Sequence, residues 1–429
     1  MTDSVSTAKH HVGWRIKLKC IAISCTAAIV LTAQLCSAQQ SSAAKQRITA
    51  PSPEIQKALA LEGQGKYSDA VSAWQSVVMA QPRNGQAYAH LGLLEARQQH
   101  YPEAITFYRK AQALDPAIPQ LNMDLGLALF KSSNFRDAAK LFEEELRKHP
   151  KSPEAAKLTT LAAMSHYGEH EYAAAVPYLR EATAADPRNL TILLTLANCL
   201  LWTKQLDATM EVFKEILIIN PDSAEADMIA GEALDEKGDS EGAVQQFRAA
   251  VLANPKEPNV HFGLAYLLWT QKKYDEAIPE FKAELANDPR NGQAMIYLGD
   301  TYVRQDQFDL GKAVLEDAAR FQTSNPLIHL DLGIVYMETG DQDAAIREFE
   351  KTVALEPDNV TAHFRLGTLY RSMGKKDEAR VEFAKANSLN KKTDQGLYKR
   401  IAEANARPDS ETKPEDSQKP DAAPKPDQR

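Results

Sequence analysis

One short stretch of the chain contains residue types that could bind a metal ion. Residues 166–170 read His-Tyr-Gly-Glu-His, so two imidazoles and a carboxylate lie within five residues. Neutral imidazole binds Zn²⁺, and a glutamate beside a zinc-bound water can act as a general base. This chemistry would make the chain a metal-dependent hydrolase centred on His166, Glu169 and His170.

The local sequence argues against this alternative. The order H-x-x-E-H resembles the motif of inverted zinc metalloproteases, whose two histidines lie one turn apart on a continuous helix. Here Gly168 stands between the histidines, and the repeat pattern described below places the segment, with three extra residues beside it, between two helices. We therefore expect a polar inter-helix turn. The sequence predicts no metal site and no cofactor there.

Cysteine is the other reactive residue type. Cys199 stands in the apolar run Ala197-Asn198-Cys199-Leu200-Leu201, which predicts a buried structural thiol rather than a nucleophile. The sequence also contains no glycine-rich phosphate loop and no G-x-S-x-G motif. We therefore expect a protein without enzymatic activity and without catalytic or cofactor-binding residues.

Residues 1–38 have the composition of an export signal. Arg15, Lys17 and Lys19 precede an apolar run from Cys20 to Ala33, and small residues end the stretch at Ala38. The run is shorter than the roughly 20 apolar residues of a membrane span, so we expect a cleaved signal peptide. An uncleaved membrane anchor is the alternative. Both predict a chain that acts outside the cytoplasm, as a periplasmic or extracellular protein or from the membrane surface.

The charge of the chain excludes one class of partner. The formal net charge is −8, and loss of residues 1–38 would remove four basic residues and one acidic residue to leave −11. A protein that binds nucleic acid usually presents a basic stripe, so no nucleic-acid partner is expected. The same cleavage would leave Cys199 as the single cysteine, which excludes an internal disulfide.

The elements that must position any site repeat along the chain. Proline recurs every 34 residues, except for a spacing of 37 before Pro187 and of 68 before Pro357. The prolines that mark this period are Pro82, Pro116, Pro150, Pro187, Pro221, Pro255, Pro289 and Pro357. Proline disfavours helical geometry in the preceding residue and lacks the N–H that a continuing helix needs. Each period therefore ends with the end of a helix.

Residue size varies with the same period. The eighth position is small, as in Gly92 and Gly231, the twentieth is small, as in Ala104 and Ala243, and the twenty-fourth is bulky, as in Phe247. Small residues let two helices approach closely, and a bulky residue fills the space beside them. The length and these positions resemble the tetratricopeptide-repeat family.

The resemblance implies an all-α fold, a right-handed superhelical α-solenoid of antiparallel helix pairs. We expect ten repeats over residues 51–393, starting at residues 51, 85, 119, 153, 190, 224, 258, 292, 326 and 360. A polar leader should occupy residues 39–50, and a closing helix residues 394–406, with Thr393 and Asp394 at its start. Residues 407–429 contain five prolines and no apolar residue larger than alanine, which predicts a disordered tail.

The resemblance also implies where a partner binds. In the family, the second, fifth, ninth and twelfth positions of the first helices line a concave groove. With Trp202, the residue after a twelfth position, the groove candidates are Met123, Leu127, Phe130, Met164, Leu194, Asn198, Leu201, Trp202, Phe262, Tyr266, Trp269, Ile296, Met337 and Phe364. Some of these side chains could pack against the neighbouring repeat instead. Trp202 and Trp269 are the residues expected to project furthest and to contribute most to binding.

A family subset binds C-terminal carboxylates through lysine and asparagine at the fifth and ninth positions. Here Leu194 occupies the fifth position before Asn198, so carboxylate capture is not expected. An apolar helix or extended protein segment fits better, and the acidic Glu225, Glu232 and Asp235 favour a basic stretch or form a solvated face.

The sequence thus predicts a protein–protein interaction scaffold, and an envelope, export or polysaccharide assembly is the kind of assembly in which we expect it to act. A spacer without a specific ligand is the remaining alternative. The membrane would be contacted only through an uncleaved N-terminal segment, and the sequence leaves the oligomeric state open.

Overall fold

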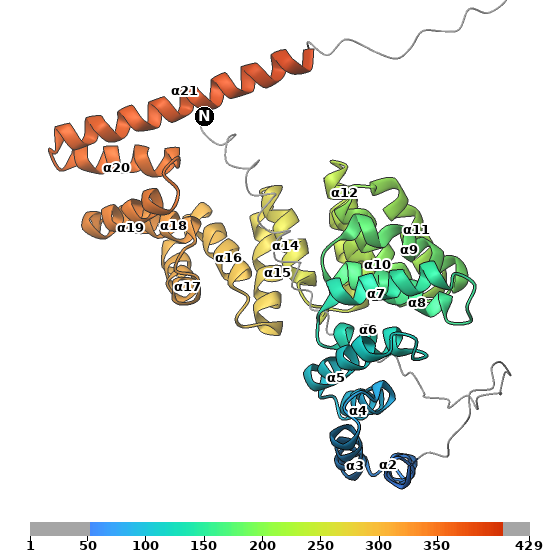
Figure 1. The fold of residues 1–429 in the computed structure, drawn as a ribbon. Helices are drawn as coiled ribbons and strands as arrows, with labels where there is room; N and C mark the ends of the chain where they lie inside the picture. The colour runs from blue at the N-terminus through green and yellow to red at the C-terminus, as the bar shows by residue number, and fades with distance from the viewer. Residues whose placement is uncertain (1–51, 406–429) are drawn as a thin grey trace, which may run out of the picture. The chain divides into compact units, whose positions relative to one another are not determined.

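The fold consists of helices throughout the described part of the chain. The computed structural model describes residues 52–405. The expected signal or anchor (1–38), the polar leader (39–50) and the tail (407–429) lie outside the described residues. Within 52–405 the chain forms twenty helices, arranged as ten successive pairs, which confirms the all-α solenoid of helix pairs (Figure 1).

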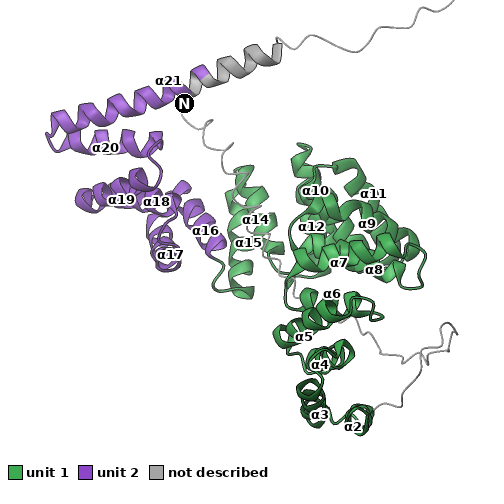
Figure 2. Ribbon diagram, viewed as in Figure 1, with its two compact units in different colours: residues 1–291 green, residues 292–429 purple. Residues whose placement is uncertain are grey.

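The chain divides into two compact units, residues 1–291 and 292–429 (Figure 2). The helix pairs of the first unit are α2 (Pro53–Gly63) with α3 (Tyr67–Ala80), α4 (Gly85–Arg97) with α5 (Tyr101–Leu114), α6 (Leu121–Lys131) with α7 (Phe135–Lys148), α8 (Ala155–Gly168) with α9 (Tyr172–Ala185), α10 (Leu190–Trp202) with α11 (Leu206–Ile219), α12 (Ala224–Glu236) with α13 (Ser240–Ala253), and α14 (Val260–Thr270) with α15 (Tyr274–Asn287). Those of the second unit are α16 (Gly292–Arg304) with α17 (Phe308–Phe321), α18 (Pro326–Glu338) with α19 (Gln342–Leu355), and α20 (Val360–Ser372) with α21 (Lys376–Asn405).

The two helices of a repeat approach closely at the eighth position. A Cβ atom added at Gly92 would lie 2.6 Å from the Tyr108 ring, and one added at Gly231 would lie 2.6 Å from the Phe247 ring. The bulky residues at the twenty-fourth position are buried, with Phe247 at 0% exposure and Trp74 at 2%. The size pattern in the sequence is therefore the packing of each helix pair.

Short polar segments set where the helices begin and turn. Asn84 and Asn359, two residues after the repeat-ending proline, accept hydrogen bonds from the backbone N–H groups of Ala87 (3.1 Å) and Ala362 (2.9 Å). These side chains cap the first helices. Between the helices of every pair, one residue has a positive φ, and it is glycine in only four of the ten turns. The positive-φ residues are Gly65, Gln99, Ser133, His170, Lys204, Gly238, Lys272, Asp306, Gly340 and Gly374.

Hydrogen bonds between histidine and glutamate join the two helices in three repeats. Nδ1 of His261, His329 and His363 lies 2.6, 2.7 and 2.6 Å from a carboxylate oxygen nineteen residues further on. In His329, Nε2 also lies 3.2 Å from the carbonyl oxygen of Thr323. Both ring nitrogens therefore face acceptors, and the hydrogen bond to Glu348 raises the pKa of His329.

The last helix corrects one prediction from the sequence. A separate closing helix over residues 394–406 is wrong, because α21 runs without interruption from Lys376 to Asn405. The tenth repeat has Lys391 where eight of the nine earlier repeats have proline, so nothing there removes an N–H donor or obstructs the helix.

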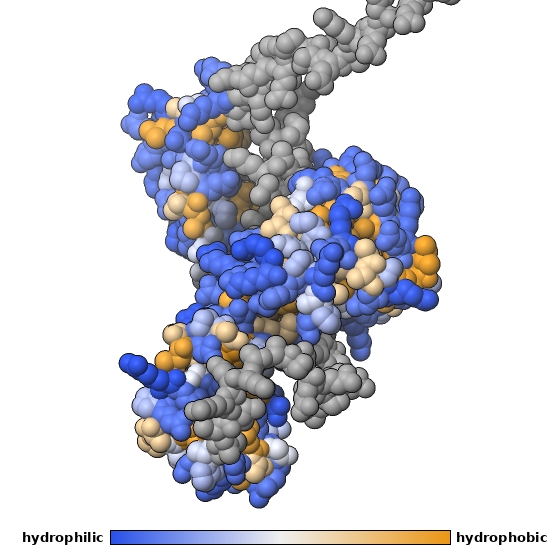
Figure 3. Space-filling view, turned by 45° about the vertical axis from the view of Figure 1, so that its right-hand side comes forward, coloured by the Kyte–Doolittle hydropathy of each residue, from blue (hydrophilic) through white to orange (hydrophobic). Residues whose placement is uncertain are grey.

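No helix of the described chain is both long enough and apolar enough to cross a membrane. On the face drawn in Figure 3, apolar residues form separate patches among mostly hydrophilic ones. Such scattered apolar residues are normal at a protein surface. They do not by themselves mark a binding site.

Candidate partner-binding surface

The His-Tyr-Gly-Glu-His stretch forms the turn between α8 and α9. His166 lies in the last turn of α8, Glu169 follows the helix, and His170 has a positive φ of 62°. The two histidines are thus not on one helical face, as expected for an inter-helix turn. A Cβ atom added at Gly168 would lie 2.6 Å from the Phe135 ring, so this glycine allows the turn to pack on the preceding repeat.

His166, Glu169 and His170 each already contact a protein partner. Nε2 of His166 lies 2.8 Å from Glu143 and Nδ1 lies 2.8 Å from Glu171. Glu169 forms an ion pair with Arg136 at 3.3 Å, and His170 contacts the hydroxyl of Tyr172. No group of three or more histidine, cysteine, aspartate or glutamate side chains in residues 52–405 is arranged to hold a metal ion.

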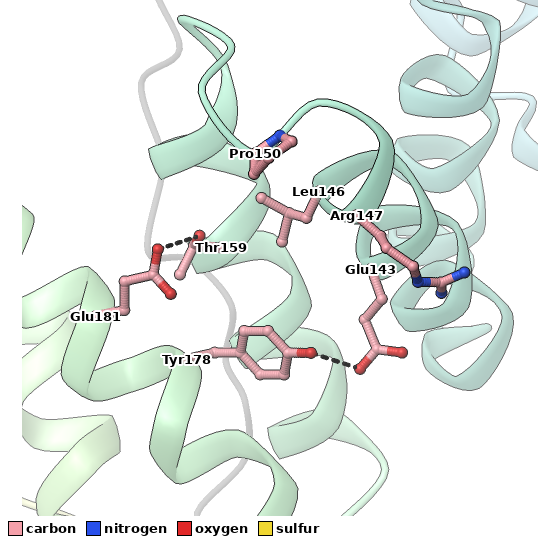
Figure 4. Close-up of a pocket in the computed structure, with 7 residues that line it drawn as sticks. All are labelled: Glu143, Leu146, Arg147, Pro150, Thr159, Tyr178 and Glu181. Carbon is pink, nitrogen blue, oxygen red and sulfur yellow. Dashed lines mark hydrogen bonds between the residues drawn. The ribbon is translucent and has the colours of Figure 1, made fainter.

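A pocket of about 360 Å³ lies between α7, α8 and α9 (Figure 4). Two pairs of its polar side chains are hydrogen-bonded: the hydroxyl of Tyr178 donates to Glu143 over 3.0 Å, and that of Thr159 donates to Glu181 over 3.5 Å. Partial burial, together with the Glu143 carboxylate, raises the pKa of Tyr178. Four of the polar side chains that line the pocket are therefore engaged with one another, in two separate pairs.

Cys199 is buried in α10, as predicted. Its side chain is 0% exposed, and burial raises the pKa of the thiol to about 12. A thiol with this pKa remains protonated near neutral pH and is a weak nucleophile.

The groove candidates of the first unit differ in exposure. Leu201, Phe262, Tyr266 and Trp269 are buried, at 5% exposure or less. The half-buried candidates are Met123, Leu127, Phe130, Met164, Leu194, Asn198 and Trp202.

Trp269 is not the exposed anchor that its position in the repeat suggested. It is 5% exposed, and its ring stacks on that of Tyr266 with the centroids 5.8 Å apart. The expectation that Trp269 projects into an open groove is therefore wrong. All residues of α14 from Val260 to Trp269 are buried, so the twelfth position is enclosed like its neighbours.

Three of the sequence candidates lie together in a cleft. Asn198, Leu201 and Trp202 at the end of α10 face Glu225, Met228, Ile229 and Glu232 of α12, and Glu257 completes the lining. The two helices belong to adjacent repeats and pack against each other. We call this the α10–α12 cleft.

The lining of the α10–α12 cleft contains both apolar side chains and glutamates. Leu201, Met228 and Ile229 are 3 to 5% exposed and form its apolar part. Trp202 stacks on Tyr172 with 5.6 Å between the ring centroids, which fixes the orientation of its indole. Partial burial and the nearby charge of Glu257 raise the pKa of Glu225.

The candidates of the second unit lie on three separate helices. Ile296 in α16 is 1% exposed, Met337 in α18 is half-buried, and Phe364 in α20 is 54% exposed. Phe364 contacts the ring of Phe383 with 5.6 Å between the centroids.

The sequence identified the α10 residues of the cleft, but only some of the residues that α12 and the loop after α13 contribute. Glu225 and Glu232 were noted as acidic residues, whereas Met228, Ile229 and Glu257 were not among the candidates. Asp235 does not line the cleft. Met228 occupies the fifth position of the sixth repeat, so applying the family's groove positions to every repeat could have identified it.

Two protein-family profiles, both described as Tetratricopeptide repeat, match the chain. One matches residues 55–119, 123–159, 230–292 and 330–386, and the other matches residues 166–233 and 268–330. The first profile alone covers half of the chain.

Individual relatives are more distant. The BBSome complex member BBS4 of Bos taurus is 23% identical over 218 residues, which span 51% of this chain and 41% of that protein. This chain thus matches less than half of that relative's length. The structure of YrrB, described as a TPR protein with an unusual peptide-binding site, is 20% identical with a TM-score of 0.39, covering 47% of this chain and 99% of YrrB. MamA from Desulfovibrio magneticus RS-1 is 20% identical with a TM-score of 0.37, covering 40% of this chain and 97% of MamA.

Proposed function

Because the chain belongs to the tetratricopeptide-repeat family, we propose that it is a non-enzymatic scaffold that binds a segment of another protein in the α10–α12 cleft. The family's fold implies protein partners. Asn198, Leu201 and Trp202 were expected at the groove from their repeat positions, and all three line this one cleft. That convergence is the observation that carries the proposal.

The dimensions of the cleft favour a protein segment over a small molecule. Its volume is about 30 Å³, whereas sites for drug-sized ligands and cofactors occupy roughly 300–1,000 Å³. A cleft of this size can hold part of a side chain presented by a longer chain. The half-buried Trp202, oriented by Tyr172, is the rigid aromatic contact that such recognition commonly uses.

We further propose that the scaffold acts outside the cytoplasm. The support is the sequence of residues 1–38, with Arg15, Lys17 and Lys19 before the apolar run from Cys20 to Ala33. Membership of an envelope, export or polysaccharide assembly would suit an exported scaffold. Fractionation of cells that produce the full chain, followed by N-terminal sequencing, tests both the location and cleavage after Ala38.

Replacement of Trp202 tests the binding site. We expect Trp202→Ala to weaken partner binding by about 2 kcal/mol or more, because an aromatic contact in a desolvated cleft is lost. A photo-crosslinking amino acid at Asn198 in the full chain identifies the partner in cells, and titration of that partner onto both chains measures affinity.

The matched control is the buried tryptophan of the first repeat. Trp74 is 2% exposed at a twenty-fourth position, so Trp74→Ala should lower the free energy of unfolding by about 3–5 kcal/mol. Trp202→Ala should cost less stability than this. Equal binding by the Trp202→Ala and unaltered chains, with both folded in denaturant melts, would contradict the proposed site.

A further inference from the structure

We propose that the α10–α12 cleft selects a partner segment in which a lysine or arginine stands next to a large apolar residue. This inference rests on the function proposed above and adds the chemistry of the ligand. It follows from the charge of the lining, the apolar part of the cleft and the position of Trp202.

The lining has a single sign of charge. Three of its eight residues are glutamates, Glu225, Glu232 and Glu257, and none of the eight is basic. The carboxylates come from the first turn of α12, from two turns further along the same helix and from the loop after α13, so the fold gathers them from separate places in the sequence. A cationic side chain would offset their mutual repulsion, whereas an acidic segment would add to it.

The repulsion between carboxylates affects the pKa of Glu225. The charge of Glu257 contributes, after partial burial, to the raised pKa of Glu225. Glu257 accepts a hydrogen bond from the side-chain amide of Asn254 at 2.8 Å, which holds its carboxylate in place. At least one of the three carboxylates is therefore held in position by a neighbouring side chain.

The apolar part of the cleft complements the stem of a basic side chain. The half-buried Trp202 supplies the accessible apolar surface along which the methylene groups of lysine or arginine can lie. Leu201, Met228 and Ile229 line the cleft beside it but are only 3 to 5% exposed. The indole of Trp202 can also stack against a guanidinium group, a contact that is strengthened by desolvation. An apolar neighbour in the segment would cover the remaining exposed part of the indole.

The acidic lining also argues against a ligand that presents a C-terminal carboxylate. The family members that bind C-terminal carboxylates place lysine and arginine on the groove. At the cleft described here, the corresponding helices present Leu194 and Ile229 together with glutamates. A terminal carboxylate would meet like charges and no cationic donor among the lining residues.

Peptide selection on the full chain tests this inference. A displayed library of random twelve-residue peptides is selected on the immobilised protein, in parallel with the Trp202→Ala chain and with a Glu225→Gln/Glu257→Gln chain. We expect peptides with arginine or lysine beside leucine, methionine or an aromatic residue to be enriched on the unaltered chain alone.

The strongest selected peptide is then measured by fluorescence polarisation. We expect Glu225→Gln/Glu257→Gln to weaken its binding at least tenfold and raised salt to weaken it further, because the screened interaction is electrostatic. The control variant is Glu211→Gln/Glu215→Gln. It removes the same charge from exposed positions of α11 and should change the affinity less than twofold.

Other results of the peptide selection would contradict either the charge preference or the binding site. Selected peptides without a basic residue that compete at the Asn198 crosslink would overturn the charge selection and leave the scaffold function standing. Equal enrichment on the unaltered and Trp202→Ala chains would overturn the cleft as the binding site.

Residues 9–33 of this chain contain four basic residues and an apolar run, and are therefore a further competitor to test. Stronger competition by a peptide of that sequence than by any selected peptide would assign the cleft to this chain's own N-terminal segment and overturn a separate partner.

Discussion

Asp331 is a buried carboxylic acid without full hydrogen bonding. It lies in α18 at 3% exposure, and its Oδ2 atom has no hydrogen-bond partner within the described chain. Asp300 of the neighbouring α16 is 1% exposed and binds Arg304 at 2.7 Å. Burial, and then the charge of Asp300, raises the pKa of Asp331 well above its ordinary value of 3.8. The folded protein therefore favours the protonated form of Asp331.

This residue should make stability depend on pH. Below pH 3.8 Asp331 is protonated in both the folded and unfolded chains, so its contribution is constant. As the pH rises to its folded pKa, the unfolded chain ionises first, and stability should fall by about 1.4 kcal/mol per pH unit. Asp331→Asn should remove this decline, as measured by urea melts of the full chain from pH 4 upward.

An exposed carboxylate provides the control for that measurement. Asp309 lies at the start of α17 and is exposed, so Asp309→Asn should leave the pH dependence of the unaltered chain in place. Parallel curves for Asp331→Asn and the unaltered chain would show that Asp331 is ionised in the fold.

At the scale of the helix, close contacts between glycine and an aromatic ring determine how repeats join. The ring of Phe247 in α13 lies between Gly231 of its own repeat and Gly263 of the next. A Cβ atom at Gly263 would lie 2.1 Å from that ring, closer than any real contact. This position therefore sets the spacing between α13 and α14.

Two glycines make a matched test of this packing. Gly263→Ala should destabilise the protein by about 1–3 kcal/mol, because the added methyl group forces α13 and α14 apart. Gly63 is at the end of α2 with nothing within 4 Å of an added Cβ. There, alanine should instead stabilise by about 0.4–1 kcal/mol by restricting the unfolded chain. Denaturant melts measure both, and the same sign for both variants would contradict the packing argument.

At the scale of the whole molecule, the helices within each of the two units pack mainly on their neighbours in the chain. Stability in such a solenoid is approximately a sum of repeat and nearest-neighbour contributions. The damage from one substitution should therefore remain near that substitution.

Phe247→Ala tests this locality. Loss of the buried ring should cost about 3–5 kcal/mol. Hydrogen exchange should accelerate in α12, α13 and α14, whereas α2, α3 and α4 should keep their protection, although all six helices belong to the same unit. Uniform acceleration across these six helices would indicate cooperative unfolding of that unit in place of local unfolding.

The sequence alone determined the repeated parts of this protein. The proline period predicted the helix pairs, Gly92 and Gly231 predicted the close approach, and Gly168 marked the His166–His170 stretch as a turn. These features follow from sequence because each depends on residues within one repeat or the next. The same local reasoning correctly predicted that Cys199 is buried. It was wrong about a separate helix after residue 393, where Lys391 stands in place of the repeat-ending proline.

The tertiary structure alone decided which groove residues are accessible. Trp202 and Trp269 stand at nearly equivalent positions, yet Trp202 lines the α10–α12 cleft and Trp269 is buried against Tyr266. A period identifies the face of a helix on which a residue lies. Its exposure depends on the side chains that neighbouring helices place against that face, and Met228, Ile229 and Glu257 complete the cleft only when α10 and α12 pack together.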